Sequence, residues 1–313
     1  MKAAVLALVL FASSAEAGLE RYRSLVVADD THPSRPAAGG VRVTYLGVNG
    51  YQLEAGEHAL LIDPYFSRVG LAAVALQQPI APHQGRIAGG LQHVRRRVEA
   101  VLVTHAHFDH LLDVPEIMRR TSARLVAGPT AANLVQAVGI ARARCLVVQP
   151  GEQRRISTWT ITVLAAQHDR VFGSRPPFGG TVSHPAPPPR TASDWKLGEP
   201  LAFLIAANGQ RIYIDSGGAP GGPPLNLGRI DLAIISTALP DSRRRFAATV
   251  RALQPRVVLP SHQDDFFAPY DRGFAFGKLT NFPQVLHSHR QEQLPGRLIL
   301  LDYFRPWTLR SGR

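Results

Sequence analysis

One stretch, Val101 to His110, constrains more than any other what this chain can fold into. It reads Val-Leu-Val-Thr-His-Ala-His-Phe-Asp-His, so a run of apolar and β-branched residues leads directly into three histidines and an aspartate. The apolar run predicts a buried strand, and a strand cannot bury so many polar side chains without partners, because each unpaired group costs free energy. Imidazole nitrogen and carboxylate oxygen are ligands that zinc accepts. The pattern therefore predicts a metal site at the end of a strand, in preference to a solvated histidine-rich loop.

Three later residues also follow apolar strands. His168 follows Val163 to Gln167, Asp215 follows Ile212 to Ile214, and His262 follows Val257 to Ser261. Strand ends on one edge of a sheet are where open α/β sites collect their residues. A histidine or aspartate at one strand end is weak evidence alone. Together with the first motif these residues give seven nitrogen and oxygen ligands, enough for two metals that share a carboxylate.

The order of predicted elements indicates one mixed α/β domain. A β meander opens at residues 41–46, 51–54 and 58–63, with a hairpin turn at Asn49-Gly50. Strands at 124–127, 144–148, 159–165, 201–206, 211–215, 231–236, 256–259 and 297–303 then alternate with helices at 114–120, 130–138 and 242–253. Residues 66–98 show no clear period and predict a long loop with one short helix at 69–76. This order predicts a mixed sheet with helices outside.

Two segments rich in Pro and Gly, Gly173–Pro189 and Gly217–Gly228, predict loops over the strand ends. Loops this long in a compact domain are usually functional or mobile, and they suit a substrate lid. His184 in the first segment is a candidate proton donor to the leaving group. Asp63, at a strand end before Pro64, is interpreted as a partner that orients a histidine ligand, with turn capping as the alternative. His287 and His289 are interpreted as surface residues.

The N-terminus predicts export. Lys2 is followed by an apolar run from Ala3 to Ala12, and Ala15-Glu16-Ala17 is a small-x-small cleavage signal. We expect residues 1–17 to be a signal peptide, 18–40 an irregular lead-in, 41–305 the single folded domain that carries the metal site, and 306–313 a tail. The mature protein is then periplasmic or secreted, and no later stretch is long and apolar enough for a transmembrane span.

Charge and cysteine content narrow the choice of partners. The formal net charge is +12, and a basic protein can bind nucleic acid or anionic membranes. The arginines are scattered, apart from the runs 95–97 and 243–245, and neither run is interleaved with aromatic residues as in single-strand binders. These runs are interpreted mainly as solvated faces, and no nucleic-acid partner is expected. Cys145 is the only cysteine, so no intrachain disulfide can form, and its place in an apolar strand favours a small core residue.

At this point the chain resembles the metallo-β-lactamase superfamily, most closely the bacterial branch of ascorbate-phosphate lactonase-like and N-acylphosphatidylethanolamine phospholipase D-like hydrolases. The resemblance runs from Val41 to Asp302 and depends on motifs that occur in a fixed order. The motifs are residues 44–47 (TYLG), 61–66 (LIDPYF), 105–110 (HAHFDH), 167–168 (QH), 214–217 (IDSG) and 260–264 (PSHQD). The chain departs from many relatives at Ile214, where they carry Gly, and in the length of the Gly173–Pro189 segment.

The resemblance implies an αββα sandwich, with two mixed sheets face to face and helices outside. It also implies one metal held by His105, His107 and His168. The second metal is held by Asp109, His110 and His262, and Asp215 bridges both.

The expected protein is an exported binuclear zinc hydrolase. A metal-bridging hydroxide, fixed by Asp109 and Asp215, would cleave an ester, lactone, amide or phosphodiester in a small-molecule or lipid-like substrate. Two alternatives remain open. A mononuclear iron dioxygenase of the same superfamily needs only two histidines and one carboxylate, and a non-catalytic periplasmic zinc-binding protein needs no substrate loops.

Overall fold

The computed structural model describes residues 18–29, 40–95, 97–170, 175–185, 187–220, 222, 226–239, 242–277, 280 and 282–310. The signal peptide predicted for residues 1–17 lies outside the described residues, as do parts of the lead-in and of the Gly173–Pro189 segment. Among the helices of the described chain, none has the length and apolar character needed to cross a membrane.

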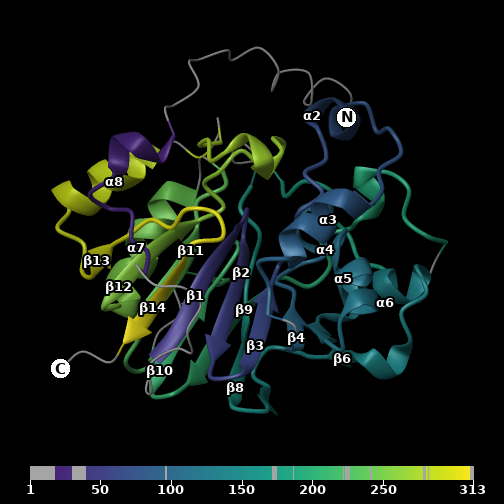
Figure 1. The fold of residues 1–313 in the computed structure, drawn as a ribbon, viewed down its shortest axis with the longest axis horizontal. Helices are drawn as coiled ribbons and strands as arrows, with labels where there is room; N and C mark the ends of the chain where they lie inside the picture. The colour runs from purple at the N-terminus through teal and green to yellow at the C-terminus, as the bar shows by residue number, and fades with distance from the viewer. Residues whose placement is uncertain are drawn as a thin grey trace.

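Two seven-stranded sheets form the centre of the molecule, with helices on both outer sides (Figure 1). The first sheet has the order β14-β1-β2-β3-β4-β5-β6. Its strands are β1 (Gly40–Gly47), β2 (Gly50–Ala55), β3 (His58–Ile62), β4 (Val98–Leu102), β5 (Arg124–Ala127), β6 (Cys145–Val147) and β14 (Pro306–Arg310). The second sheet has the order β13-β12-β11-β10-β9-β8-β7. Its strands are β7 (Gln153–Ile156), β8 (Trp159–Ala165), β9 (Leu201–Ala207), β10 (Gln210–Ile214), β11 (Leu232–Ser236), β12 (Val257–Ser261) and β13 (Arg297–Leu298).

The helices divide between the two outer layers, which confirms the αββα sandwich. Those beside the first sheet are α2 (Leu71–Ala75), α3 (Gln84–Leu91), α4 (Phe108–Leu111), α5 (Val114–Arg120) and α6 (Pro129–Ala137). Those beside the second are α7 (Ser242–Leu253) and α8 (Phe282–Gln291). Three buried clusters match these layers. One lies between the sheets, around Trp159 and Phe203, and one lies under each helical layer. The central strands are apolar on both faces because both faces are covered.

Strand direction explains why residues far apart in sequence meet at one edge. In the first sheet β3, β4, β5 and β6 run parallel, and in the second β10, β11 and β12 run parallel. Strand β8 is antiparallel to β9, and β9 is antiparallel to β10, so β8 points in the same direction as β10. The residues that follow β8, β10 and β12 therefore leave the second sheet at the same edge. The residues that follow β4 leave the first sheet at the edge where its parallel strands end.

The β9–β10 hairpin follows the turn chemistry that an Asn-Gly pair predicts. Asn208 and Gly209 have φ of 48° and 72° and join β9 to β10, as expected for an Asn-Gly turn whose central residues are both left-handed. The β1–β2 hairpin differs from the expectation: Gly50 is already the first residue of β2 and pairs with Gly47, so the turn lies at Val48-Asn49, where Val48 has a left-handed φ of 57°.

Several parts of the chain differ from the expectation, among them strand β7, which was not predicted. Residues 306–310 were predicted to lie in a tail, whereas they form β14 and pair with β1. The last predicted strand, 297–303, is short: β13 ends at Leu298, and Leu300 forms a bridge with Val26 from the lead-in. Residues 84–91, predicted as loop, form α3. Its Gly90 is required by packing, since a Cβ there would lie 2.3 Å from the Phe66 ring.

Candidate metal centre

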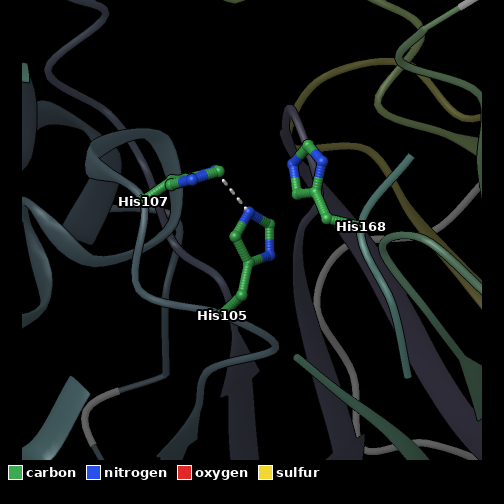
Figure 2. Close-up of side chains that lie close together, drawn as sticks. All are labelled: His105, His107 and His168. Carbon is green, nitrogen blue, oxygen red and sulfur yellow. Dashed lines mark hydrogen bonds between the residues drawn. The ribbon is translucent and has the colours of Figure 1, made fainter. Parts of the chain in front are cut away.

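The first cluster consists of His105, His107 and His168, each of which offers a nitrogen within 4.8 Å of the others. Figure 2 shows the three rings turned toward a common point, with His105 and His107 from the loop after β4 and His168 from the loop after β8. Nε2 of His105 lies 3.0 Å from Nδ1 of His107. The structure thus brings together the three histidines that the sequence predicts for one metal.

Each of these rings has an inner nitrogen, which faces the other histidines, and an outer nitrogen, which faces away from them. In two of the rings a backbone carbonyl lies against the outer nitrogen. Nε2 of His107 lies 3.0 Å from the carbonyl oxygen of Pro177, and Nδ1 of His168 lies 2.6 Å from the carbonyl oxygen of Asp169. A carbonyl can only accept, so these outer nitrogens carry the protons. The inner nitrogens, Nδ1 of His107 and Nε2 of His168, therefore present lone pairs, as metal-binding imidazoles do.

A hydroxyl and a carboxylate orient His105 in the same way. Thr104 Oγ1 donates to Asp63 Oδ2 at 2.6 Å, so the lone pairs of this hydroxyl face Nδ1 of His105 at 3.2 Å. With the proton on Nδ1, the inner Nε2 also presents a lone pair. Two such lone pairs 3.0 Å apart repel each other unless a cation lies between them, and the donor set fits zinc.

The second cluster consists of Asp109, His110 and His262. Nε2 of His262 lies 3.2 Å and Nε2 of His110 lies 3.5 Å from Oδ2 of Asp109. Nδ1 of His110 donates to Oδ2 of Asp63 at 2.8 Å, which confirms that Asp63 orients a histidine. The two predicted metal-binding triplets thus lie together, and Asp63 connects their outer hydrogen bonds.

Burial and mutual proximity set the charge of these groups. Burial, followed by the field of the neighbouring histidines, holds the pKa of His105 and His107 well below the ordinary range, so both imidazoles are neutral and can bind a metal. Burial alone would raise the pKa of Asp109, but His110 and His262 lower it, so this side chain is a carboxylate.

Local backbone geometry places His262 at the cluster. Strand β12 pairs with β13 only at Val257 and Val258, so Pro260 lies where one side of the strand has no neighbour and its missing N–H is tolerated. His262 then adopts a left-handed φ of 55° and donates its backbone N–H to the carbonyl of Val48 at 2.9 Å. This turn aims the ring at Asp109.

Asp215 lies in neither cluster. Its buried carboxylate accepts from Tyr213 Oη at 2.9 Å, from the backbone N–H of Ser236 at 3.3 Å, and from Nη1 of Arg245 at 3.2 and 3.3 Å. Burial raises the pKa of Asp215 in spite of the opposing field of Arg245. The bridging role that the resemblance implies for Asp215 stays a prediction.

Arg245 is the residue that sequence reasoning missed. The run 243–245 was interpreted as a solvated face, whereas the Arg245 side chain is only 13% exposed. It donates to both oxygens of Asp169, at 3.0 and 2.8 Å, as well as to Asp215. Because the Asp169 carbonyl orients His168, Arg245 connects the first cluster to Asp215. Nothing in a run of arginines indicates which of them faces inward.

The Gly173–Pro189 segment contributes backbone and an aromatic ring to the site. Besides the Pro177 carbonyl, the ring of Phe178 packs edge-on to His107, with centroids 6.0 Å apart. His184 is exposed and bonds Ser183 Oγ at 3.1 Å, so it belongs to neither cluster. His287 is exposed and His289 half-buried on α8, and neither joins a cluster.

The αββα fold and the clustered ligands define a metal-dependent hydrolase of the metallo-β-lactamase fold. A family model described as "Beta-lactamase superfamily domain" matches residues 58–262, and the chain belongs to this family. The resemblance noted from the motifs is thereby confirmed for the superfamily, but not for the lactonase-like and phospholipase D-like branch.

A curated relative is named a metal-dependent hydrolase, and two solved structures share the fold. A UPF0173 metal-dependent hydrolase of Rubrobacter xylanophilus is 27% identical over 235 residues, which cover 73% of this chain and 84% of the relative. Igni18, a metallo hydrolase of the archaeon Ignicoccus hospitalis, aligns with a TM-score of 0.58 at 17% identity over 87% of this chain and all of its own. CmlA, a diiron β-hydroxylase of Streptomyces venezuelae, aligns with a TM-score of 0.53 at 13% identity over 90% of this chain and 55% of its own. The two structural likenesses concern the fold alone.

Proposed function

We propose that the protein is an exported binuclear zinc hydrolase. The observation that carries the proposal is the pair of triplets, His105–His107–His168 and Asp109–His110–His262. In every histidine of the two triplets except His262, an outer hydrogen bond to a carbonyl, hydroxyl or carboxylate oxygen frees the inner nitrogen. Six ligands in two groups suit two metals, whereas a mononuclear iron dioxygenase needs only three. When bound, zinc supplies a Lewis acid and a water of lowered pKa.

The protein's own residues would hold and orient this chemistry. The imidazoles of His105 and His107 are neutral and Asp109 is ionised, so Asp109 brings a negative charge to the second triplet that would offset metal charge. Asp63 and Thr104 fix the ring orientations of His105 and His110 from behind. Phe178 packs edge-on to His107, and Phe266 packs edge-on to His262 with centroids 5.1 Å apart, so one aromatic ring lies beside each triplet.

Asp215 is the proposed bridging carboxylate, and Arg245 competes with metal for it. If Asp215 bridges, Asp215→Asn reduces the zinc content below two per chain, and Arg245→Gln preserves both zincs because the competing cation is gone. If Asp215 serves only to anchor Arg245, the Asn variant keeps two zincs. Zinc content by mass spectrometry of the washed proteins separates these results.

The substrate class is tested with a panel of esters, lactones, amides and phosphodiesters on the zinc-loaded protein. The resemblance to the lactonase-like and phospholipase D-like branch is the reason to include lactones and phosphodiesters. Hydrolysis that disappears on chelation and returns with zinc supports the proposal. Iron in place of zinc, together with oxygen consumption, would instead favour an oxygenase, and tight zinc binding without turnover would favour a zinc-binding protein.

Export is tested on the mature protein. Lys2, the apolar run Ala3–Ala12 and Ala15-Glu16-Ala17 support cleavage after Ala17. Mass spectrometry of the protein from its native cell should find Gly18 at the N-terminus. A mature chain that begins at Met1 would overturn this part of the proposal.

A further inference from the structure

A cavity of about 440 Å³ adjoins the first metal cluster, a size typical of small-molecule sites. His168 is part of its wall, so the cavity reaches the cluster itself. The rest of the wall comes from the residues on either side of His168, from the loop after β10, and from α7. Three of the wall residues are arginines: Arg170, Arg244 and Arg245.

The three arginines differ in how far their charge is compensated. Arg245 is held by Asp169, the carboxylate in the wall, and by Asp215 behind it. Arg170 and Arg244 are exposed, and within the described part of the chain neither forms an ion pair. The wall therefore carries two positive charges that no side chain of the described protein neutralises.

We propose that this cavity binds an anionic oxygen group of the substrate, a carboxylate or a phosphate, through Arg170 and Arg244. The inference rests on the proposed hydrolase function and narrows its substrate to a small organic anion. Guanidinium forks match the geometry of both oxyanions and bind them with charge-assisted hydrogen bonds. Arg170 follows His168 by two residues, so the anionic group is anchored beside the first metal cluster and the scissile bond lies toward the metals.

The fixed network around Arg245 makes the wall suitable for this role. Arg245 donates to Asp169 and Asp215 and to the carbonyl of Ser236 at 2.7 Å, so it holds the floor of the cavity in place. Its donors are therefore committed to the protein, and the two unpaired arginines are the ones that receive the ligand. An uncharged ester gains nothing from either of them.

The test compares the double variant Arg170→Gln/Arg244→Gln with wild type, and with Arg251→Gln as control. Arg251 is also an exposed arginine of α7, but it pairs with Glu292 and lies outside the cavity wall. Calorimetric titrations of the zinc-loaded proteins with inorganic phosphate and with acetate give the dissociation constants. Zinc content is measured in each protein, so that anion bound directly to metal contributes equally.

We expect the dissociation constant for at least one of the two anions to rise about five- to tenfold for each arginine lost, and to stay within twofold in the control. Phosphate and acetate arms show which oxyanion the cavity prefers. Equal affinities of wild type and double variant for both anions would overturn the proposal.

A pair of nitrophenyl esters, the neutral acetate and the anionic hemisuccinate, provides a second readout with the same leaving group. We expect kcat/KM to favour the hemisuccinate in wild type and in the control, and this preference to disappear in the double variant while the neutral ester is unaffected. A preference that survives in the double variant would contradict the inference. If neither ester is hydrolysed, ester hydrolysis as the proposed function fails, and the anion titration still decides about the cavity.

Discussion

Asp63 is predicted to control the affinity of the metal centre although it binds no metal. Its fully buried carboxylate accepts from four donors: Asn49 Nδ2 at 2.8 Å, the Thr104 backbone N–H at 2.8 Å, Thr104 Oγ1 at 2.6 Å and His110 Nδ1 at 2.8 Å. In Asp63→Asn the shape is preserved but the charge is lost. Whichever way the amide is turned, its NH₂ group faces at least one of these donors.

The expected magnitude follows from these contacts. One buried donor without a partner costs about 1–3 kcal/mol, and loss of the charge weakens the remaining hydrogen bonds, which are charge-assisted. Outer partners of metal-binding histidines typically contribute about 10–100-fold in metal affinity. Because His110 bonds Asp63 directly, we expect zinc affinity at the second cluster to fall by about this factor.

Competition with a chromogenic chelator measures the zinc affinities, and Asp231→Asn is the control. Asp231 is also buried and accepts from the Arg211 backbone N–H at 2.9 Å, but it precedes β11 and so lies away from the strand ends that carry the ligands. The control should lose stability and keep its zinc affinity. Zinc affinities within twofold of wild type in the Asp63 variant, or equal losses in both variants, would refute the reasoning.

Three further predictions concern the backbone, the ligands and a buried ion pair. Gly217→Ala should displace the loop that carries His168, because a Cβ there would lie 1.8 Å from the Gln167 carbonyl oxygen. Zinc titration should then show a weakened first site. In the control Gly70→Ala, where a Cβ meets nothing within 4 Å, zinc binding should not change. His105→Ala and His262→Ala should each weaken a different one of two sites, and two tightly bound zincs in both variants would show that the ligands are wrongly assigned. Asp264→Asn should lower the free energy of unfolding, measured in urea, by about 3–5 kcal/mol. The buried Arg68, which pairs with Asp264 at 2.8 Å, would then have no counter-charge. Burial would raise the pKa of Asp264, but Arg68 lowers it below its ordinary value. Wild type should therefore lose stability as the pH falls from about 4 to below this lowered pKa. The Asn variant should lose less stability over the same pH range.

The six side chains that cluster in the structure could be picked out from the sequence because their signal is local. His105, His107, Asp109 and His110 lie within one short motif, and His168 and His262 each follow an apolar strand of ordinary length. The fold places these strand ends on one edge, so the two triplets meet. The partner role of Asp63 was also predicted, from its place at a strand end, although its four hydrogen bonds were not.

Features that depend on distant contacts were missed. Helix α3 carries Gly89-Gly90, which lowers helix propensity, and it forms because the missing side chain at Gly90 lets it approach Phe66. Strand β14 does not pair with a strand close to it in sequence. It pairs with β1, about 260 residues earlier in the chain. The ion pairs of Arg245 likewise join residues 76 and 30 positions apart, a separation that no local pattern reports.

The central claim, two metal sites built from the two triplets, is tested most directly by anomalous diffraction from crystals of the zinc-loaded protein at the zinc edge. The account predicts two peaks per chain. One should lie between the inner nitrogens of His105, His107 and His168, and the other should be bound by Asp109, His110 and His262. A single peak per chain, or peaks bound by other residues, would contradict it.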